Sequence, residues 1–549
     1  MSSTVLGCAK RILSLDWWDA FRKRPLSYSL CAIIGCRLIY RLLLYPRLFS
    51  PLRRVPGPAI GDPIVGACAP IFAKEAGVPA REWVKKYGPV VRVVGPVGIE
   101  RLYIASPEAL HQILVREWQD YERPEYLRHT LGLVAGHGLL TVTGKDHREM
   151  RKAMNPAFSL ATLATQLEMY YDHIETLIDV LDTLVGDKMD GDVLPTYEWM
   201  SKVTLDIIAD TAFGYKANSL RDPHNELATA FGNMMDLQNG PNLFKIVLFM
   251  SLPGVPRLVQ TDWAYKHRHW FSKIPFLRPA ETLIESTYHI RRISKAILQE
   301  RIQEAAITAT SDTAQKRDIM SILVRARQAD LDLDSAVYAM SDRAMIDQAL
   351  TFLGAGHETT ASGLAWTLWL LACDQECQQK LRDELTPVLA ANKRPDYRTL
   401  KEMRWLDCVV MESLRVLPPV PLTVRKAFKT DILAGYLVPK GTYLHIPIRV
   451  INTWTAIWGP DAEEFRPSRW LDLPKTYNPA FSLMSFIAGP HGCIGKTMAI
   501  IEMKAVLASL ITSFEFFPVH EGQKIKPAAA ITMKPTDGMP LRVRRVRQC

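Results

Sequence analysis

One cysteine, Cys493, lies in a run whose residue types suit metal binding, Phe-Ile-Ala-Gly-Pro-His-Gly-Cys-Ile-Gly at residues 486–495. Glycine adopts backbone conformations that are closed to residues with a Cβ. We therefore expect Gly489 and Gly492 to shape a tight loop that exposes the sulfur. We also expect Gly495 to leave room beside the sulfur for a large flat ligand.

The residues that follow the loop predict a helix. Apolar side chains recur with helical periodicity over residues 499–510. The N-terminal amides of this helix and the positive end of its dipole would lie next to Cys493, so we expect the pKa of the thiol to be lowered. The resulting thiolate is a suitable ligand for iron.

Three other interpretations of the run compete with a metal-bound thiolate. Gly495-Lys496-Thr497 resembles the end of a phosphate-binding loop, but that pattern needs glycine where Pro490 stands, and proline has no N–H to offer. His491 and Cys493 could be half of a zinc site, yet no second Cys/His pair has zinc spacing. A cysteine can also simply pack in the core. That is our expectation for the other eight: Cys8, Cys31, Cys36, Cys68, Cys373, Cys377, Cys408 and Cys549.

The spacing Phe-x-x-Gly-x-x-x-Cys-x-Gly resembles the haem-binding signature of the cytochrome P-450 family, the haem-thiolate monooxygenases. The resemblance implies haem b as cofactor, Cys493 as the axial ligand of its iron and Phe486 as a cofactor-binding residue. A thiolate ligand pushes electron density onto the iron and favours O–O cleavage. The loop alone favours haem over the three other interpretations.

A second motif, Ala-Gly-His-Glu-Thr-Thr at residues 355–360, lies inside a predicted apolar helix over residues 344–372 with Ser341 as its N-cap. Threonine can bond the carbonyl of the preceding turn, and glycine weakens a helix, so we expect a widened turn with freed backbone groups. The alternative is a core helix with a packing notch and a stray acid. In the family this helix kinks over the haem, which implies that Thr359 steadies dioxygen and Glu358 relays protons.

Glu412 and Arg415 lie three residues apart in a predicted helix over residues 406–417. Such a pair is common on helix surfaces. The family, however, combines a Glu-x-x-Arg motif with a downstream Pro-x-Arg, which Arg469 completes here. The resemblance thus implies a buried Glu412–Arg415–Arg469 network, in which each charge must be satisfied by the others. We expect these residues to support the haem site structurally and not to act as catalysts.

Gly144-x-x-His147-x-x-x-Arg151 resembles the family's helix whose basic face binds a haem propionate. The resemblance adds Arg425 and His491 to the propionate-binding set. Tryptophan is usual in the family where His147 stands, and arginine where His491 stands. Histidine is charged only when its pKa is raised. The alternative for His147 is an exposed helix histidine.

The whole chain has 549 residues, 48% hydrophobic and 23% charged, which is enough to bury a large core in one domain or two. Helical periodicity dominates, and strand-like runs are few and short. The sequence therefore predicts a mainly α fold with small β-sheets (α+β). The resemblance implies the P-450 fold, with haem between a long kinked distal helix and a proximal cysteine-loop helix. Further predicted helices cover 161–184, 197–213 and 281–306, and predicted strands cover 90–94, 101–104, 424–429 and 443–447.

The N-terminal residues 26–44 are apolar over a length of about 28 Å at 1.5 Å per residue, close to a bilayer core of about 30 Å. Arg37 and Arg41 lie toward the end of this stretch, where long side chains can reach the headgroups. We expect residues 1–58 to form a membrane anchor and proline-rich hinge, and 59–549 the haem-thiolate catalytic domain. The alternative is an amphipathic helix that lies on the membrane surface.

The resemblance implies that the anchor lies in the endoplasmic reticulum membrane, with the catalytic domain in the cytosol. Two observations are consistent with this location. The sequence has no Asn-x-Ser/Thr sequon, and its nine cysteines have no regular spacing, which favours a reducing compartment.

The net charge is +10, and it predicts an acidic partner. We expect six basic residues to share the face on the cysteine side of the haem: Lys145, Arg148, Arg151, Lys152, Lys496 and Lys504. The resemblance implies that the partner is an NADPH-cytochrome reductase, with cytochrome b5 as a second candidate. Nucleic acid is a poor alternative, because no basic motif is interleaved with aromatic residues.

The resemblance implies a monooxygenase that inserts one oxygen atom from O2 into a lipophilic small molecule by hydroxylation or epoxidation. It is closest to fungal members, many of which tailor terpenoids and other secondary metabolites or oxidise xenobiotics. We expect Phe352, Ala355 and residues 531–533 in the pocket wall. Two rivals stay open: a haem-thiolate isomerase or dehydratase that does not use O2, and a non-catalytic haem carrier or sensor.

Overall fold

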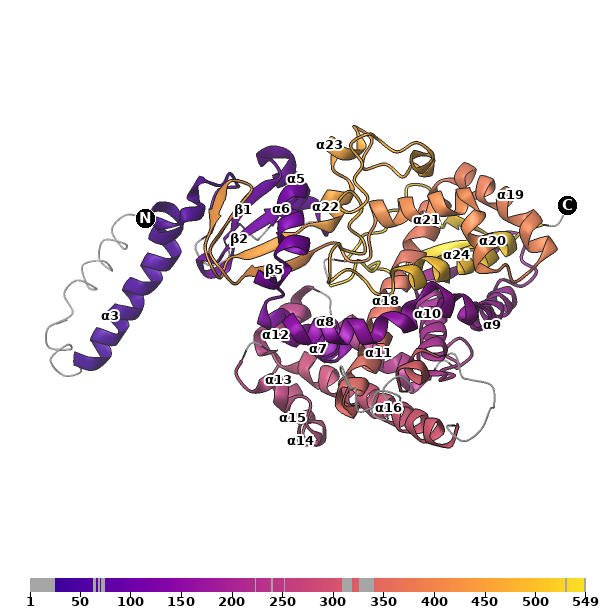
Figure 1. The fold of residues 1–549 in the computed structure, drawn as a ribbon, viewed down its shortest axis with the longest axis horizontal. Helices are drawn as coiled ribbons and strands as arrows, with labels where there is room; N and C mark the ends of the chain where they lie inside the picture. The colour runs from indigo at the N-terminus through magenta and orange to yellow at the C-terminus, as the bar shows by residue number, and fades with distance from the viewer. Residues whose placement is uncertain are drawn as a thin grey trace, which may run out of the picture.

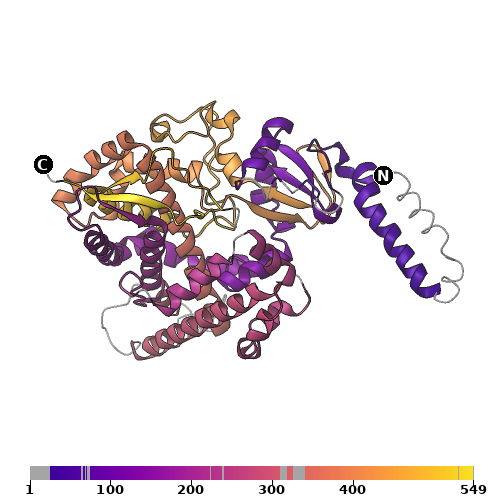
Figure 2. The same cartoon turned by 180° about the vertical axis from the view of Figure 1, so that it is seen from behind.

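The computed structural model places a five-stranded sheet and its covering helices beside a larger helical region, which also holds a three-stranded sheet (Figure 1). The helix α3 points away from both parts (Figures 1 and 2). The fold is α+β with helices predominating, which confirms the sequence-based prediction. The structure describes residues 25–547 apart from 63–65, 68–69, 71–74, 223, 238–239, 251, 309–317, 325–339 and 529–530.

The five-stranded sheet has the strand order β1-β2-β8-β5-β3. β2 and β8 are parallel, and the other neighbouring pairs are antiparallel. The sheet thus joins two parts of the chain that are more than 300 residues apart and sets β3 beside β5. The four predicted strands form within two residues of their expected bounds. The strands are β1 (Val90–Val94), β2 (Glu100–Ile104), β8 (Tyr443–Ile446), β5 (Thr423–Ala427) and β3 (Tyr121–Glu122).

Two smaller sheets are formed by the other described strands. The three-stranded sheet has the order β4-β10-β9 and is antiparallel throughout. Its central strand comes from the C-terminal residues, so the end of the chain is paired on both sides. The strands are β4 (Asp192–Pro195), β10 (Pro540–Arg545) and β9 (Phe514–Pro518), and the two-stranded sheet pairs β6 (Asp431–Leu433) with β7 (Tyr436–Val438).

The helix α18 (Asp342–Cys373) is the longest described helix, and most of its residues are buried around its whole circumference. A helix that is hydrophobic on all sides belongs in a core. It begins where the sequence predicted, because the Ser341 Oγ accepts a hydrogen bond from the Ala344 amide at 3.2 Å. It packs against α7 (Glu125–Ala135), α10 (Thr196–Phe213), α16 (Arg278–Thr308) and α21 (Arg404–Val416).

The helix α24 (Lys496–Ser513) follows the cysteine loop, as predicted, and extends three residues beyond the expected range at each end. It contacts α9 (Leu160–Val185), α19 (Gln375–Ala391), α21 and α18. The two segments that the sequence assigned to opposite sides of a cofactor therefore belong to one packed core.

The remaining helices are short or lie at the surface. They are α5 (Val78–Tyr87), α6 (Pro107–His111), α8 (Gly144–Met154), α11 (Glu226–Asp236), α12 (Gly240–Met250), α13 (Val255–Leu258), α14 (Asp262–Lys266), α15 (His269–Ser272), α20 (Tyr397–Glu402), α22 (Ile448–Asn452) and α23 (Thr455–Trp458). Two π-helices, η1 (Tyr40–Phe49) and η4 (Gln112–Arg116), and five 3-10 helices, η2 (Pro51–Arg54), η3 (Pro96–Gly98), η5 (Trp118–Asp120), η6 (Asn155–Phe158) and η7 (Pro467–Leu471), complete the described elements.

At the N-terminal end, α3 (Pro25–Ile39) continues directly into η1. The segment Ser29–Phe49 is long and apolar enough to cross a membrane, with a mean hydropathy of 1.4 and only 6% of it buried. Its last turn is fixed to the large sheet, because the Arg92 guanidinium donates to the Pro46 carbonyl at 2.5 Å. The Arg92 amide also donates to the Pro56 carbonyl at 2.9 Å. The chain is therefore attached to β1 well before residue 58.

Candidate functional site

The loop that carries Cys493 is closed by its own backbone. The Cys493 amide donates to the Phe486 carbonyl, and the Gly492 amide to the Gly489 carbonyl, both at 2.8 Å. Gly489 has φ +76°, and a Cβ there would lie 1.9 Å from the carbonyl oxygen of Leu114. Only glycine tolerates both conditions. The loop is therefore pressed against η4.

The other two glycines of the loop, Gly492 and Gly495, matter because they lack a Cβ and not because of their φ angles. Neither Gly492 nor Gly495 has a positive φ, so our expectation of a special backbone conformation at Gly492 is wrong. A Cβ at Gly492 would lie 3.0 Å from the Gly489 carbonyl oxygen, which is the actual reason for a small residue. Among the described atoms, only the Cys493 Sγ would lie within 4 Å of a Cβ at Gly495, at 4.0 Å. The predicted room beside the sulfur is present.

The Cys493 side chain is exposed, and yet the surrounding protein raises the pKa of its thiol. The Gly495 amide, Arg151 and Lys496 lower this pKa, but burial outweighs them. The start of α24 therefore lowers the pKa as expected, through the Gly495 amide and Lys496, but burial around the sulfur makes the net shift upward. A metal ion that coordinates a thiol deprotonates it. The raised pKa of the free thiol does not prevent ligation.

The residues that the sequence assigned to propionate binding gather beside this loop. The rings of His147 and His491 lie 4.0 Å apart between centroids, and the Arg151 guanidinium donates to the Gly492 carbonyl at 2.5 Å. His147 is 2% exposed, so it is not an exposed helix histidine. Burial lowers the pKa of His147 to about 3 and also lowers that of His491. Both imidazoles are therefore neutral at pH 7.

Arg425 on β5 is buried in the same region. Its Nη1 donates to the Thr423 Oγ1 at 3.1 Å and to the Val424 carbonyl at 3.0 Å, whereas its Nη2 has no hydrogen-bond partner among the described residues. Burial lowers its pKa to about 9. The buried Nη2 is a donor that lacks an acceptor.

Two neighbours of Arg425 were missed in the sequence analysis. Arg123 follows β3, and burial lowers its pKa to about 10. The Glu122 Oε2 lies 3.2 Å from the His491 Nε2. The strand pairing of β3 with β5 brings both residues next to Arg425. In the sequence, the available signal was that Glu122 and Arg123 are adjacent and oppositely charged. The pairing of β3 with β5, which sets them beside Arg425, is visible only in the fold.

Glu358 and Thr359 lie in the middle of α18. The Thr359 Oγ1 donates to the Ala355 carbonyl at 2.7 Å. The buried Glu358 Oε1 accepts hydrogen bonds from the Tyr197 Oη at 2.6 Å and the Thr532 Oγ1 at 3.1 Å. Burial raises the pKa of Glu358. The helix therefore places a carboxyl group that holds its proton more tightly than usual next to a hydroxyl group.

The widened turn that we expected near Thr359 is absent. Residues 342–373 form one continuous α-helix, without a π-helical turn. The physical reason is that the Thr359 hydroxyl adds a bond to the Ala355 carbonyl without replacing the backbone ladder. The predicted back-bond is therefore found, and the predicted break in the ladder is not.

The structure brings Glu412, Arg415 and Arg469 together in the interior. Arg415 binds both Glu412 oxygens at 2.7 Å, and the Arg469 Nε lies 3.3 Å from the Glu412 Oε1. The Trp470 Nε1 also donates to Glu412, at 2.9 Å. The Arg469 guanidinium is bound further by Asp461. All the charges of this network are compensated, so it links α21 to η7.

The family model for Cytochrome P450 matches residues 62–541 of this sequence. The chain belongs to the cytochrome P450 family. Cytochrome P450 monooxygenase 205 of Postia placenta is 32% identical to it over 510 residues, which cover 88% of this chain and 90% of that protein. Cytochrome P450 monooxygenase claO of Ampulloclitocybe clavipes is 30% identical over 90% of this chain and 93% of its own. Cytochrome P450 monooxygenase sphH of Aspergillus fumigatus is 28% identical over 93% and 91%. This P450 is accordingly a monooxygenase with fungal relatives.

Membership of the P450 family implies a haem-thiolate cofactor, and the residues present fit one. The Cys493 thiol is accessible, and Gly495 leaves space beside it. Haem also carries two carboxylates, which need donors. The Arg425 Nη2 is a buried donor near the loop without a partner among the described residues, and the His147 Nδ1, a donor in one of the two neutral tautomers, is also unpaired. Buried donors are normally satisfied, so unpaired ones indicate an acceptor that belongs there.

One sequence-based placement in this P450 is wrong, and a second stays a prediction. Lys504 is not on an exposed basic face: it is 5% exposed and binds Asp407 at 2.7 Å, because it points from α24 into a contact with the neighbouring helices. The Phe352 ring lies 5.4 Å from that of Phe158 and 6.3 Å from that of Phe213, within the core, and its place in a pocket wall stays a prediction. Periodicity alone does not distinguish these faces of a buried helix.

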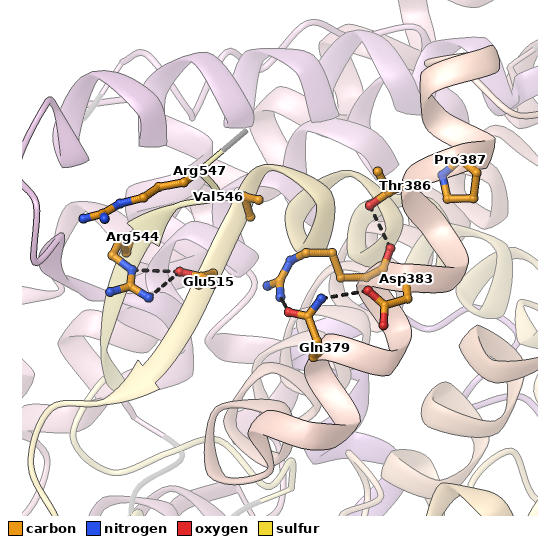
Figure 3. Close-up of a pocket in the computed structure, with 9 residues that line it drawn as sticks. Gln379, Asp383, Thr386, Pro387, Glu515, Arg544, Val546 and Arg547 are labelled. Carbon is orange, nitrogen blue, oxygen red and sulfur yellow. Dashed lines mark hydrogen bonds and ion pairs between the residues drawn. The ribbon is translucent and has the colours of Figure 1, made fainter. Parts of the chain in front are cut away.

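A surface pocket of about 650 Å³ lies between α19, β9 and β10 (Figure 3). Arg382 and Arg544 line it, and both are engaged: Arg382 by the Ile511 and Phe514 carbonyls, and Arg544 by Glu515. The pocket is next to the C-terminal end of α24, about 27 Å along that helix from its start. It is therefore separate from the cysteine loop of the P450.

Proposed function

We propose that this P450 inserts one oxygen atom from dioxygen into a lipophilic small molecule by hydroxylation or epoxidation, with haem b as its cofactor. The reaction consumes one O2, two electrons and two protons, and leaves the second oxygen atom in water. The observation that carries the proposal is the accessible Cys493 thiol in a glycine-shaped loop at the start of α24.

Cys493 is proposed as the axial ligand of the haem iron. When bound, the haem supplies the oxidising chemistry, which a thiolate ligand favours. Arg425, Arg151 and the two adjacent histidines, His147 and His491, would hold its carboxylates. Phe486 packs at the loop on the same side. Arg123 extends this set, because the pairing of β3 with β5 sets it beside Arg425.

Glu358 and Thr359 are proposed as the residues that handle protons on the opposite side. Thr359 keeps its hydroxyl oriented by donating to the Ala355 carbonyl. Glu358 exchanges a proton at its carboxyl group, and burial favours the protonated form there by raising the pKa of the acid. Glu412, Arg415 and Arg469 are structural: their closed network fixes the segment between α21 and the cysteine loop.

The electrons are proposed to come from an NADPH-cytochrome reductase, with cytochrome b5 as an additional donor. Exposed basic side chains on α8 and at the start of α24, such as Lys145, Arg148 and Lys496, would attract its acidic surface. We place residues 1–58 as the anchor in the endoplasmic reticulum membrane and 59–549 as the catalytic domain in the cytosol. Substrates are proposed among fungal secondary metabolites, such as terpenoids, or xenobiotics.

Isotopically labelled dioxygen tests this function. The full chain is reconstituted with the reductase, NADPH and a panel of lipophilic compounds, and products are analysed by mass spectrometry. One labelled oxygen atom per product molecule is expected. Products that carry no label would instead support a haem-thiolate isomerase or dehydratase. Haem binding without NADPH-dependent conversion across the panel would support a carrier or sensor.

A further inference from the structure

The carboxyl group of Glu358 is held asymmetrically. Tyr197 and Thr532 both donate to Oε1, and none of the described residues donates to Oε2. An oxygen that already accepts two hydrogen bonds is a poor site for a proton. The two donors come from positions 161 and 174 residues away along the chain, so the arrangement is a product of the tertiary fold.

Tyr197 is fixed by the backbone that surrounds it. It lies in the first turn of α10, whose exposed amides need acceptors outside the helix. The Thr196 amide donates to the Met539 carbonyl at 3.1 Å, and the Tyr197 amide to the Gly538 carbonyl at 3.2 Å. The C-terminal segment before β10 therefore sets the position of the phenol.

Thr532 is fixed in a comparable way. Its neighbour Met533 donates its amide to the Pro419 carbonyl at 2.7 Å. The Met533 carbonyl accepts from the Ser362 Oγ at 3.0 Å and from the Trp366 Nε1 at 2.5 Å, both on α18. The segment around Thr532 is thus bound to α18, the helix that carries Glu358, at positions one and two turns after that acid. The Thr532 hydroxyl has little freedom to move away.

The charged groups around Glu358 do not by themselves orient it. Lys534 stabilises the ionised form and Asp236 opposes it, and these two form an ion pair of their own at 2.9 Å. Their effects on the acid partly cancel. The geometry of the carboxyl group is therefore left to the two neutral donors.

We propose that Tyr197 and Thr532 are positioning residues: they hold the Oε1 of Glu358 as a hydrogen-bond acceptor, so that the transferable proton is carried on Oε2. This inference rests on the proposed role of Glu358 as a proton relay. Neither residue donates the proton that is consumed. Each fixes which oxygen of the acid presents it.

Infrared spectroscopy of the haem-loaded full chain tests the positioning directly and needs no substrate. The C=O band of protonated Glu358 is identified as the carboxylic band that Glu358→Gln removes. Tyr197→Phe and Thr532→Val are each expected to shift this band to higher frequency, because the carbonyl oxygen loses a donor. Thr532→Ser keeps the hydroxyl and should leave the band in place.

A matched control separates this effect from the loss of any buried tyrosine hydroxyl. The Tyr171 Oη donates to the Pro395 carbonyl at 2.7 Å in a buried position, and it is not among the donors to Glu358. Tyr171→Phe should not move the Glu358 band. If Tyr197→Phe fails to fold, the comparison of Thr532→Val with Thr532→Ser gives the result by itself.

The functional consequence is measured as hydrogen peroxide released per NADPH oxidised, with reductase present and no substrate added. Reduction of O2 by two electrons and two protons gives peroxide, and reduction by four of each gives two waters. A misplaced proton should raise the peroxide yield by about five-fold in Tyr197→Phe and Thr532→Val, equivalent to one hydrogen bond. Tyr171→Phe and Thr532→Ser should match the wild type.

The outcomes distinguish an error in the positioning role of Tyr197 and Thr532 from an error in the proposed relay role of Glu358. A Glu358 band that stays in place in both Tyr197→Phe and Thr532→Val overturns the positioning role alone. The same holds if Glu358→Gln raises the peroxide yield and these two variants do not. If Glu358→Gln itself leaves the peroxide yield unchanged, the relay role in the proposed function is wrong, and this inference falls with it.

Discussion

At the scale of single residues, the cysteine loop is surrounded by more hydrogen-bond donors than the protein satisfies. Arg425 illustrates this, with one nitrogen occupied by β5 and the other unpaired among the described residues. The resemblance to the P450 family implied this residue, together with Cys493, Glu358 and Thr359. Arg123 could not be found in the same way, because its importance depends on a strand pairing. The sign of the Cys493 pKa shift was also beyond the sequence, because burial has no sequence motif.

Replacing Arg425 should weaken haem retention. Arg425→Leu removes a charge-assisted donor, and losing such a bond costs about 1.5–3 kcal/mol, or roughly 10- to 150-fold in affinity. Haem content per polypeptide is measured after gel filtration and after competition with apomyoglobin. Arg221→Leu is the control, because this arginine is exposed and lies 3.8 Å from Asp179. Equal haem retention in the two variants would contradict the assignment.

Gly489 in the cysteine loop gives a second prediction at the scale of single residues. Gly489→Ala combines a positive φ with a backbone clash at Leu114, so the loop must move and haem incorporation should fall sharply. Gly441→Ala is matched in φ, at +92°, but has no described atom within 4 Å of the added Cβ. It should cost about 1–3 kcal/mol from strain alone and retain haem. Absorbance at the Soret band relative to protein reports the difference.

At the scale of elements, the long helices were predictable because their apolar faces repeat over many turns. The predicted range 281–306 became α16, and 161–184 became α9, within three residues at each end. The course of α18 within its motif was not predictable. Whether a threonine hydroxyl adds to a backbone bond or replaces it depends on how the neighbouring helices hold the segment.

The network between α21 and η7 carries an element-scale prediction. Glu412→Ala leaves two buried guanidinium groups without their carboxylate, which should destabilise the protein by about 3–5 kcal/mol. The free energy of unfolding is measured by urea titration. The control Glu402→Ala breaks an exposed pair with Arg398 and should cost less than about 1 kcal/mol. Similar losses in both variants would argue against a structural role for the network.

At the scale of the whole molecule, the sequence separated an anchor and hinge, residues 1–58, from the rest of the chain, but it did not show how the two parts contact each other. The structure shows one such contact at Pro46, whose carbonyl accepts a hydrogen bond from Arg92 on β1. Lys504 is a second example, because its burial against Asp407 depends on how α24 packs against the rest of the core. A sequence pattern does not show which distant segments of the chain contact each other.

Removal of residues 1–44 should release the protein from membranes and leave it folded, because the deletion stops short of the contact between Pro46 and Arg92. The fraction that sediments with membranes is measured for the truncated and full-length chains. An alkaline carbonate wash then separates the two forms of anchoring. Retention of the full-length chain indicates a span, and its release indicates a surface helix. Undiminished sedimentation of the truncated chain would contradict the anchor.

The most direct test of the central claim is the carbon monoxide difference spectrum of the reduced, purified protein. If the Cys493 thiolate binds the haem iron, the wild type shows the strongly red-shifted Soret band of cysteinate coordination. Cys493→Ser should lose that band. A wild-type spectrum without the red shift, or a serine variant that keeps it, would contradict the account of the site.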